Sequence, residues 1–423
     1  MYETNLYYYK LFLPYYKQIR VFTRGMQDVQ YYLKSITNKT DPDSIIRNRD
    51  YKSRAQYTNF SARTRNALSG AVFRKEPIIN MPTKLQYLIN DSNGAGLSIE
   101  QTAKSLISNL IEVGRHGLFV DYGNSAKIVS YIAENIYDYE VDEIGNLTKV
   151  VLITGKTSRK HLVLNDGIYQ VEVYLDDAKT NIIIPTKADG KTLDYIPFVF
   201  CGSVNNSPDF DEMPLWSIVD ISNGHYQNSA DYEDILGFML PTPWMNGVTD
   251  SFKETMYPDG FVQFGSGAMI VAPPDGQVGL LQASANQMHQ EAMKHKEEQL
   301  VMLGARLIMG GSAQETAEAV KIKFSSENSV LDNLVGNATD AIRQCLEWCS
   351  EFMGVEGDIE YKLNREFWDS KMSEGMVKEY KDSFIQGIVS WETLMQTLIN
   401  GGVYPTLTPD DLELEKERLS NGV

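Results

Sequence analysis

The sequence predicts an α+β protein, and three observations indicate this class. Apolar residues recur at helical spacing in long stretches, most clearly in 98–113 and 331–352. Between 127 and 200 the pattern changes to β-branched or alternating runs such as VVLIT, YQVEVYL and NIIIPT. Farther along, two polar stretches with helical length enclose a second, smaller group of β signals. With 423 residues, the chain is long enough for two or three domains.

Residues 14–75 are expected to form several helices, and a tyrosine cluster lies at the start of the chain. Tyrosine combines apolar area with a hydroxyl that needs a partner, so the cluster suits packing onto the first domain or a contact between chains. Its members are Tyr7, Tyr8, Tyr9, Tyr15 and Tyr16. The start lacks a signal-peptide pattern, and no apolar run reaches about 18 residues, so we expect no membrane span.

The charge balance argues against tight, multi-point binding of a phosphate backbone. Lys and Arg number 39 and Asp and Glu 56, which gives a formal charge of −17. Weak or sliding contact with nucleic acid stays open. Cations crowd one N-terminal stretch, where they either steer assembly or decorate a surface. They are Arg47, Arg49, Lys52, Arg54, Arg63, Arg65, Arg74 and Lys75.

The central region is expected to run from a helix into strands. Ser98 can cap a helix that continues to Gly114, and the strand GLFVDYG follows. Asn165-Asp166-Gly167 lies between two strand-like runs and is a strong signal for a tight hairpin. A helix of some 25 residues is then bracketed by Pro214 at its start and by Pro241 and Pro243 beyond its end.

The middle of this helix is unusually polar. Ser222, Asn223, Gly224, His225, Gln227, Asn228 and Ser229 are poor helix formers. Buried polar groups need hydrogen-bond partners, so such a helix does not suit a dry core made by one chain. We expect it to line water or to bond to neighbouring copies.

The last part of the chain alternates small β signals with helices. Residues 244–282 carry short β runs and the turn Pro273-Pro274-Asp275-Gly276, and a second polar helix is expected over about 284–307. The link MGGSA follows, then an amphipathic helix, the strand candidate IEYKLN and an acidic helical appendix from 372. Cys345 and Cys349 lie in the apolar stripe and are expected to be buried; with Cys201 they imply no disulfide framework.

The sequence offers little for catalysis. No two of the five histidines are spaced i and i+4, and neither GxxxxGK[ST] nor GxSxG occurs. Asp209, Asp211 and Glu212 either bind a divalent cation or favour the positive start of the following helix. Lys321 and Lys323 stand near the MGGSA link, where phosphates are a conceivable partner. We expect no catalytic residue, no metal and no cofactor.

The order of these parts resembles the portal proteins of tailed bacteriophages, the rings through which DNA enters and leaves the head. The likeness is carried by IPFVF, then MPLWSIVDISNGHYQNSADYEDILGFMLPTP, then GSGAMIVAP, then KEEQLVMLGARLIMGGSAQETAEAVKIK. The NSADYE, LGARL and ETA segments stand in the order expected for that family. The resemblance extends over most of the chain and rests on the whole set of segments.

The resemblance implies a portal fold with a wing, a two-helix stem, a small β clip, a tunnel loop and a short helical crown. The wing would cover 1–211, the first stem helix 212–240, the clip 241–283 and the second stem helix 284–307. The tunnel loop would cover 308–316, the long helix and its return to the wing 317–371, and the crown 372–423.

The resemblance also implies which residues meet partners. The tunnel loop would present Met309, Gly310, Gly311, Ser312 and Ala313 to DNA, a nearly neutral surface that does not grip phosphates. Charged candidates for the channel are Lys294, Lys321 and Lys323. The clip would dock partner proteins through Phe261, Phe264, Pro273 and Asp275.

The implied function is that of a subunit of the ring at the unique capsid vertex, commonly twelve copies, assembled in the host cytoplasm. Its expected partners are double-stranded DNA, bound without sequence specificity, the terminase large subunit, adaptor and tail proteins and the major capsid protein. Two alternatives stay open: a structural or scaffolding oligomer of the virion without a channel, and a metal-dependent hydrolase based on the Asp209 region.

Overall fold

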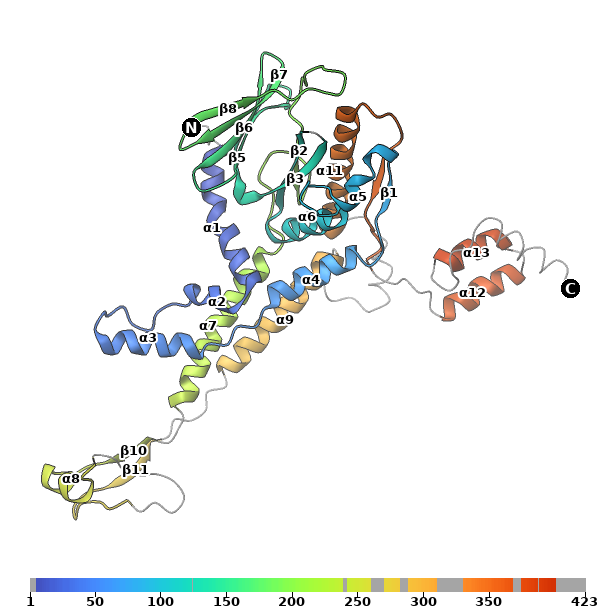
Figure 1. Cartoon of the computed structure of the whole chain (residues 1–423). Helices are drawn as coiled ribbons and strands as arrows, with labels where there is room; N and C mark the ends of the chain where they lie inside the picture. The colour runs from blue at the N-terminus through green and yellow to red at the C-terminus, as the bar shows by residue number, and fades with distance from the viewer. Residues whose placement is uncertain are drawn as a thin grey trace. The chain divides into compact units, whose positions relative to one another are not determined.

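A computed structural model of the chain describes residues 5–123, 125–238, 242–259, 270–281, 288–309, 330–367, 374–386 and 388–400. The chain divides into two compact units. The first contains residues 1–69 and 77–363, and the second contains residues 70–76 and 364–423. Helices and strands are mixed throughout the first unit, so the α+β prediction is confirmed (Figure 1).

Two antiparallel sheets form the body of the first unit. The three-stranded sheet has the order β3-β2-β9, with bounds Ala126–Ile132, Arg115–Tyr122 and Phe198–Gly202. The five-stranded sheet is a meander, β4-β5-β6-β7-β8. Its strands are Ile136–Val141, Leu147–Ile153, Ser158–Asn165, Ile168–Leu175 and Ala178–Ile183. The short strands β1 (Ile78–Asn80) and β12 (Glu360–Lys362) pair separately, and the second confirms the IEYKLN prediction.

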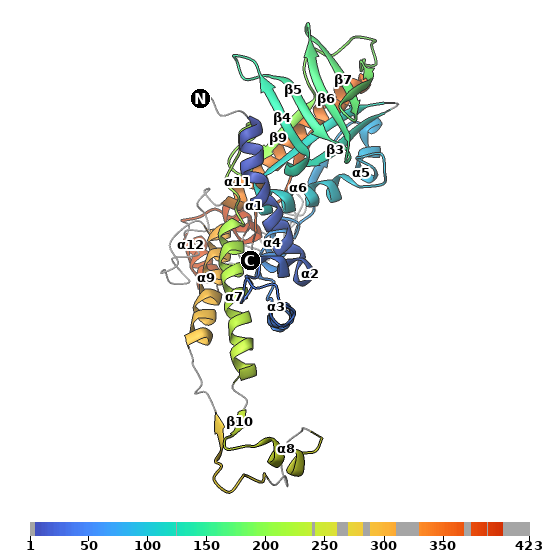
Figure 2. The ribbon, with the colours of Figure 1, turned by 90° about the vertical axis from the view of Figure 1, so that its left-hand side faces the viewer.

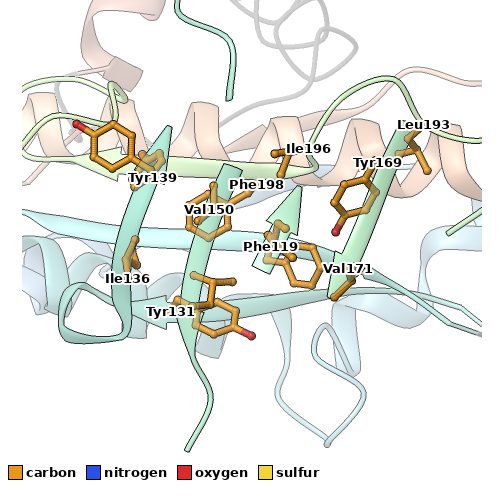
Figure 3. Packing of buried hydrophobic residues seen from close by; sticks show 13 residues of the cluster. Phe119, Tyr131, Ile136, Tyr139, Val150, Tyr169, Val171, Leu193, Ile196 and Phe198 are labelled. Carbon is orange, nitrogen blue, oxygen red and sulfur yellow. The ribbon is translucent and has the colours of Figure 1, made fainter. Parts of the chain in front are cut away.

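Side chains from both sheets build one apolar core (Figure 3). Phe119 and Tyr131 come from the smaller sheet, Val150 and Tyr169 from the larger one, and Ile196 from the segment between them. All are buried, which matches the alternating pattern of the strands. The core therefore fixes how the two sheets face each other.

The turns of the meander follow from residues that tolerate positive φ. Asp166 and Gly167 have φ of 49° and 74°, as the predicted tight hairpin between β6 and β7 requires. A second turn of this kind, Asp176-Asp177 with φ of 48° and 63°, joins β7 to β8 and had no Gly to indicate it.

Helices α6 (Ile99–Val113) and α11 (Val330–Met353) pack on the smaller sheet. Ser98 and Gln101 form a reciprocal capping box at the start of α6, which confirms the predicted cap. Gly114 ends the helix with φ of 68°, and a Cβ there would lie 2.0 Å from the Glu212 carbonyl oxygen. Cys345 and Cys349 are buried in α11, as predicted.

Helix α1 (Asn5–Arg24) begins earlier than the sequence suggested and continues through Pro14. Tyr9 and Tyr16 are buried, and the Tyr9 hydroxyl donates to the Glu134 carbonyl oxygen at 2.9 Å. Tyr7 and Tyr15 stay exposed. The tyrosine cluster thus packs onto the body along one face only. The remaining N-terminal elements are α2 (Met26–Val29), η1 (Gln30–Tyr32), α3 (Pro42–Arg54), α4 (Phe60–Val72), η2 (Thr83–Leu85) and α5 (Tyr87–Asn90).

The second unit contains α12 (Glu374–Ile385) and α13 (Trp391–Asn400). Ser390 caps α13, because its hydroxyl accepts from the Thr393 amide at 3.2 Å. Leu394 and Leu398 are buried in α13. Within the described residues of the chain, no helix combines the length and apolarity that crossing a membrane requires.

Candidate functional site

Two long helices, α7 (Trp216–Phe238) and α9 (Met288–Met309), lie side by side and run in opposite directions (Figures 1 and 2). The His225 Nε2 atom lies 3.2 Å from the Glu297 Oε1 atom across the pair. A Cβ at Gly224 would come within 3.1 Å of the Lys296 side chain, so glycine permits this close approach. The two predicted polar helices therefore exist and contact each other.

Part of the polar middle of α7 is buried within its own chain, which the sequence did not lead us to expect. Ser222, His225 and Ser229 are all buried. The Ser229 hydroxyl accepts from the Gln56 amide at 2.9 Å, and Tyr226 packs edge to face on Tyr57 at 5.4 Å. Residues between α3 and α4 thus supply partners that the local sequence does not reveal.

Two hydroxyls of this face lack a hydrogen-bond partner in the part of the chain that the structure describes. They are those of Ser222 and Tyr226, which stand four positions apart and so share one side of the helix. The Tyr57 and Tyr226 rings shield this side, and burial raises the pKa of the Tyr226 hydroxyl. The hydroxyl therefore stays protonated at neutral pH.

Charged contacts fasten α3 to the C-terminal half of α7. The Arg47 guanidinium donates to both carboxylate oxygens of Asp234, at 2.7 and 2.5 Å. Arg54 reaches the same carboxylate at 3.3 Å, and the Tyr51 hydroxyl donates to Asp231 at 2.7 Å. Burial and the Asp231 carboxylate raise the pKa of Tyr51, which keeps this donor protonated. Part of the N-terminal cation cluster is therefore structural.

The segment before α7 is ordered by Arg115, a residue that the sequence reasoning did not single out. Its guanidinium lies 4.2 Å from the Phe210 ring centroid and 4.7 Å from that of Phe200. It donates to the carbonyl oxygens of Pro208 and Asp209, both at 2.5 Å. An arginine shortly before the apolar run Leu118–Val120 was the available signal.

The acidic residues before α7 lie outside the helix, and Asp211 orders the loop that precedes it. The helix begins at Trp216, so Asp209, Asp211 and Glu212 precede its first turn, and Pro214 is not its first residue. Asp211 accepts from the Val204 amide at 2.8 Å and from the Asn205 amide at 3.3 Å. Across the described residues, no group of three His, Cys, Asp or Glu side chains is placed to hold a metal.

Between the two helices the chain forms a small module. Strands β10 (Thr242–Met245) and β11 (Val278–Leu281) pair antiparallel, and Trp244 covers Gly279, where a Cβ would lie 2.8 Å from the indole nitrogen. Helix α8 (Asp250–Met256), capped by Thr249, was not predicted. Pro273 is buried at the turn, where its carbonyl accepts from the Gly276 amide at 2.9 Å, and Asp275 is exposed. Phe261 and Phe264 lie outside the described residues.

The predicted contacts with DNA stay predictions. Met309 is the last residue of α9, and Lys294 is exposed on the same helix. Gly310, Gly311, Ser312, Ala313, Lys321 and Lys323 lie outside the described residues.

Comparison with known families gives one match. A family described as a domain of unknown function (DUF4055) matches residues 214–353, about a third of the chain, from the start of α7 to the end of α11. No curated protein matches.

Chains of several solved structures are similar to this chain at low sequence identity. A chain of the neck of a native gene transfer agent (GTA) particle, computed with C12 symmetry, is 13% identical with a TM-score of 0.47, covering 80% of this chain and 89% of that one. A chain of the native GTA virion is 12% identical with a TM-score of 0.46, over 96% and 98%. An HK97-family phage portal protein from Corynebacterium diphtheriae is 10% identical with a TM-score of 0.32, over 74% and 96%.

Proposed function

We propose that this chain is one subunit of a ring-shaped portal, placed at a single vertex of a tailed-phage capsid. The observation that supports this most is the helix pair. α7 leaves the body, the β10–β11 module follows it, α9 returns beside α7, and α11 packs back on the body. This is the order of stem, clip, stem and long helix that the sequence resemblance implies.

The internal contacts of the pair suit such a role. Arg47, Tyr51, Gln56 and Glu297 bind one α7 helix from several directions, so that α7 is held within its own subunit before any neighbour arrives. A subunit that meets identical copies around a channel needs helices of fixed position. The 23-residue α7 is long enough to give a wall of about 35 Å.

The proposed channel passes double-stranded DNA without reading its sequence. A formal charge of −17 disfavours tight binding of phosphates, and the proposed DNA-facing loop from Met309 to Ala313 carries no charge. DNA would therefore slide past it during packaging and ejection. Lys294, Lys321 and Lys323 are the proposed sites of weak phosphate contact.

The β10–β11 module is the proposed docking site for the terminase large subunit and, after packaging, for adaptor and tail proteins. Asp275 and Trp244 are exposed there, and Phe261 and Phe264 are the further proposed docking residues. Pro273 was expected on this surface, but it is buried at the turn and shapes the surface only from beneath. The major capsid protein would surround the ring in the head.

The mass and end-on appearance of the purified full-length chain test this proposal. We expect light scattering after size exclusion to give a mass near twelve times 47.8 kDa, and end-on electron micrographs to show a central opening. A monodisperse monomer at micromolar concentration would contradict the ring. A closed oligomer without an opening would instead support the alternative, a structural or scaffolding component of the virion.

A further inference from the structure

Helix α3 presents apolar side chains that its own chain does not use. Tyr51 is the buried residue of α3, and it is held by its hydroxyl as described above. Ile45 and Ile46, by contrast, are 56% and 48% exposed. Adjacent isoleucines on a helix fastened mainly by charged contacts thus leave about half of their apolar surface exposed.

An apolar groove of about 360 Å³ lies between α4 and α9. Phe60, Ala67 and Leu68 line it from α4, and Leu300, Val301 and Gly304 line it from α9. Val301 is 70% exposed, so the groove is open to solvent. A Cβ at Gly304 would lie 3.5 Å from Thr64, which shows how closely the two helices approach at the end of the groove.

The two surfaces lie on different sides of α7. α9 contacts α7 at His225, whereas α3 contacts it at Asp234. These residues are nine positions apart, about two and a half helical turns, so their side chains leave the helix in opposite directions. Figures 1 and 2 agree, with α3 on one side of α7 and α9 on another.

We propose that Ile45 and Ile46 of one subunit insert into the α4–α9 groove of the next. A surface and a complementary groove at different places on one chain give a head-to-tail contact, the type that closes into a ring. This inference rests on the proposed portal function and adds the residues by which neighbouring subunits would recognise each other.

Charges beside the two surfaces support a second copy as the occupant. Arg49 follows Ile45 and Ile46 by four and three positions, so it lies on the same face of α3, and its side chain is 74% exposed. On α9, Glu298 is exposed three positions before Val301. On the α4 side of the groove lies Arg63, and α3 carries Asp43 three positions before Ile46. Glu298 and Arg63 beside the groove thus each have an oppositely charged residue on α3, Arg49 and Asp43 respectively.

Cysteine cross-linking of the full chain tests the contact directly. The three natural cysteines are buried, so engineered thiols at exposed positions react selectively. The double variant Ile46→Cys/Val301→Cys, treated with a short bismaleimide, is expected to give a ladder of covalent multimers on a denaturing gel. Each single variant is expected to stay monomeric on the same gel.

Three outcomes, two of cross-linking and one of the mass of the wild-type chain, would overturn the proposal. Covalent dimers in the Ile46→Cys variant alone would mean that α3 meets α3 in a two-fold contact. No ladder from a double variant that still forms a ring by light scattering would mean that other surfaces join the subunits, while the portal function stands. A wild-type chain that stays monomeric would contradict both the contact and the ring.

Charge insertion provides a second, independent test. Ile45→Glu/Ile46→Glu is expected to weaken self-association at least about a hundredfold, because carboxylates resist transfer into an apolar groove. The matched control is Ile144→Glu, at an 87% exposed position in the turn between β4 and β5, which should leave association unchanged. Equal association of the two variants would overturn the proposal. A Val301→Glu variant that is less stable as a monomer but associates normally would also overturn it, because the groove would then be filled within one chain.

Discussion

Glu112 joins three helices through two arginines. It is buried on α6, where Arg65 of α4 donates to it at 2.6 Å and Arg20 of α1 contacts its other oxygen. Arg20 also donates to Glu134 at 2.9 Å. A buried carboxylate with two cationic partners is satisfied, whereas its loss leaves Arg65 without this partner and Arg20 with Glu134 alone.

We therefore expect Glu112→Ala to lower the free energy of unfolding by about 3 kcal/mol. Urea unfolding followed by tryptophan fluorescence would measure the shift. Glu100→Ala removes an exposed carboxylate that pairs with Lys104 on the same helix, and it should change stability by less than about 1 kcal/mol. Equal effects of the two changes would mean that the buried cluster contributes no more than a surface pair.

His116 is fully buried on β2, and neither ring nitrogen has a hydrogen-bond partner among the described residues. Burial, with the positive charge of Arg20 as a smaller cause, lowers the pKa of His116 to about 3. The unfolded chain binds a proton near the ordinary histidine pKa, so between these two values it binds more protons than the folded chain. His116 therefore makes the protein less stable as pH falls below about 6.5.

The variant His116→Leu should lack this contribution. The difference in unfolding free energy between variant and wild type should grow in favour of the variant by about 1.4 kcal/mol for each pH unit below 6. Urea titrations at pH 7, 6, 5 and 4 would measure it. A difference that is the same at every pH would show that the pKa of His116 is not lowered in the folded protein.

At the scale of elements, α7 is a helix that tertiary contacts stabilise. Its Gly, Asn and Ser residues give weak intrinsic helix propensity. The contacts from Arg47, Tyr51 and Gln56 compensate for this weakness. They also hold α3 in place, since α3 buries little of its own apolar surface.

Asp234→Ala should release α3 from α7. Removing the acceptor of a two-point arginine contact costs more than about 1.4 kcal/mol, so trypsin should cut between Arg47 and Arg54 roughly tenfold faster. Mass spectrometry of a digestion time course would identify the cut sites. The control Asp220→Ala lies on an exposed face of the same helix and should leave the rate unchanged. An unaltered rate in both variants would mean that other contacts hold α3.

At the scale of the whole molecule, the sequence predicted what short-range patterns determine. The capping box at Ser98, the hairpin at Asp166-Gly167 and the buried stripe of α11 depend on residues a few positions apart. The burial of α7 depends instead on distant residues, because its partners Gln56 and Arg47 stand 173 and 187 positions before the residues they contact. Helix α8 was missed because neighbouring β signals outweighed the cap at Thr249.

In the candidate site, too, the sequence predicted the helices but not the contacts between distant residues. The existence of two polar helices around a small module followed from periodicity and proline positions. The role of Arg115 was not predicted, because it depends on a contact with the Phe200 ring that forms only when β9 pairs with β2. Neighbouring copies as partners of the α7 polar face stay a prediction, and α3 and the residues before α4 already bind some of the α7 side chains.

The return of α11 to the body has a practical consequence. α11 and β12 pack on α6, β2, β9 and β1, all of which precede α7 in the chain, and α9 packs on α7. The part of the chain up to α7 and the part from α9 onward are thus held together by packing as well as by the backbone that connects them. A nick made at a protease site inserted after Asp275 should leave two polypeptides that migrate as one particle on a native gel and separate only in denaturant. Spontaneous separation would show that covalent continuity, rather than packing, closes the body.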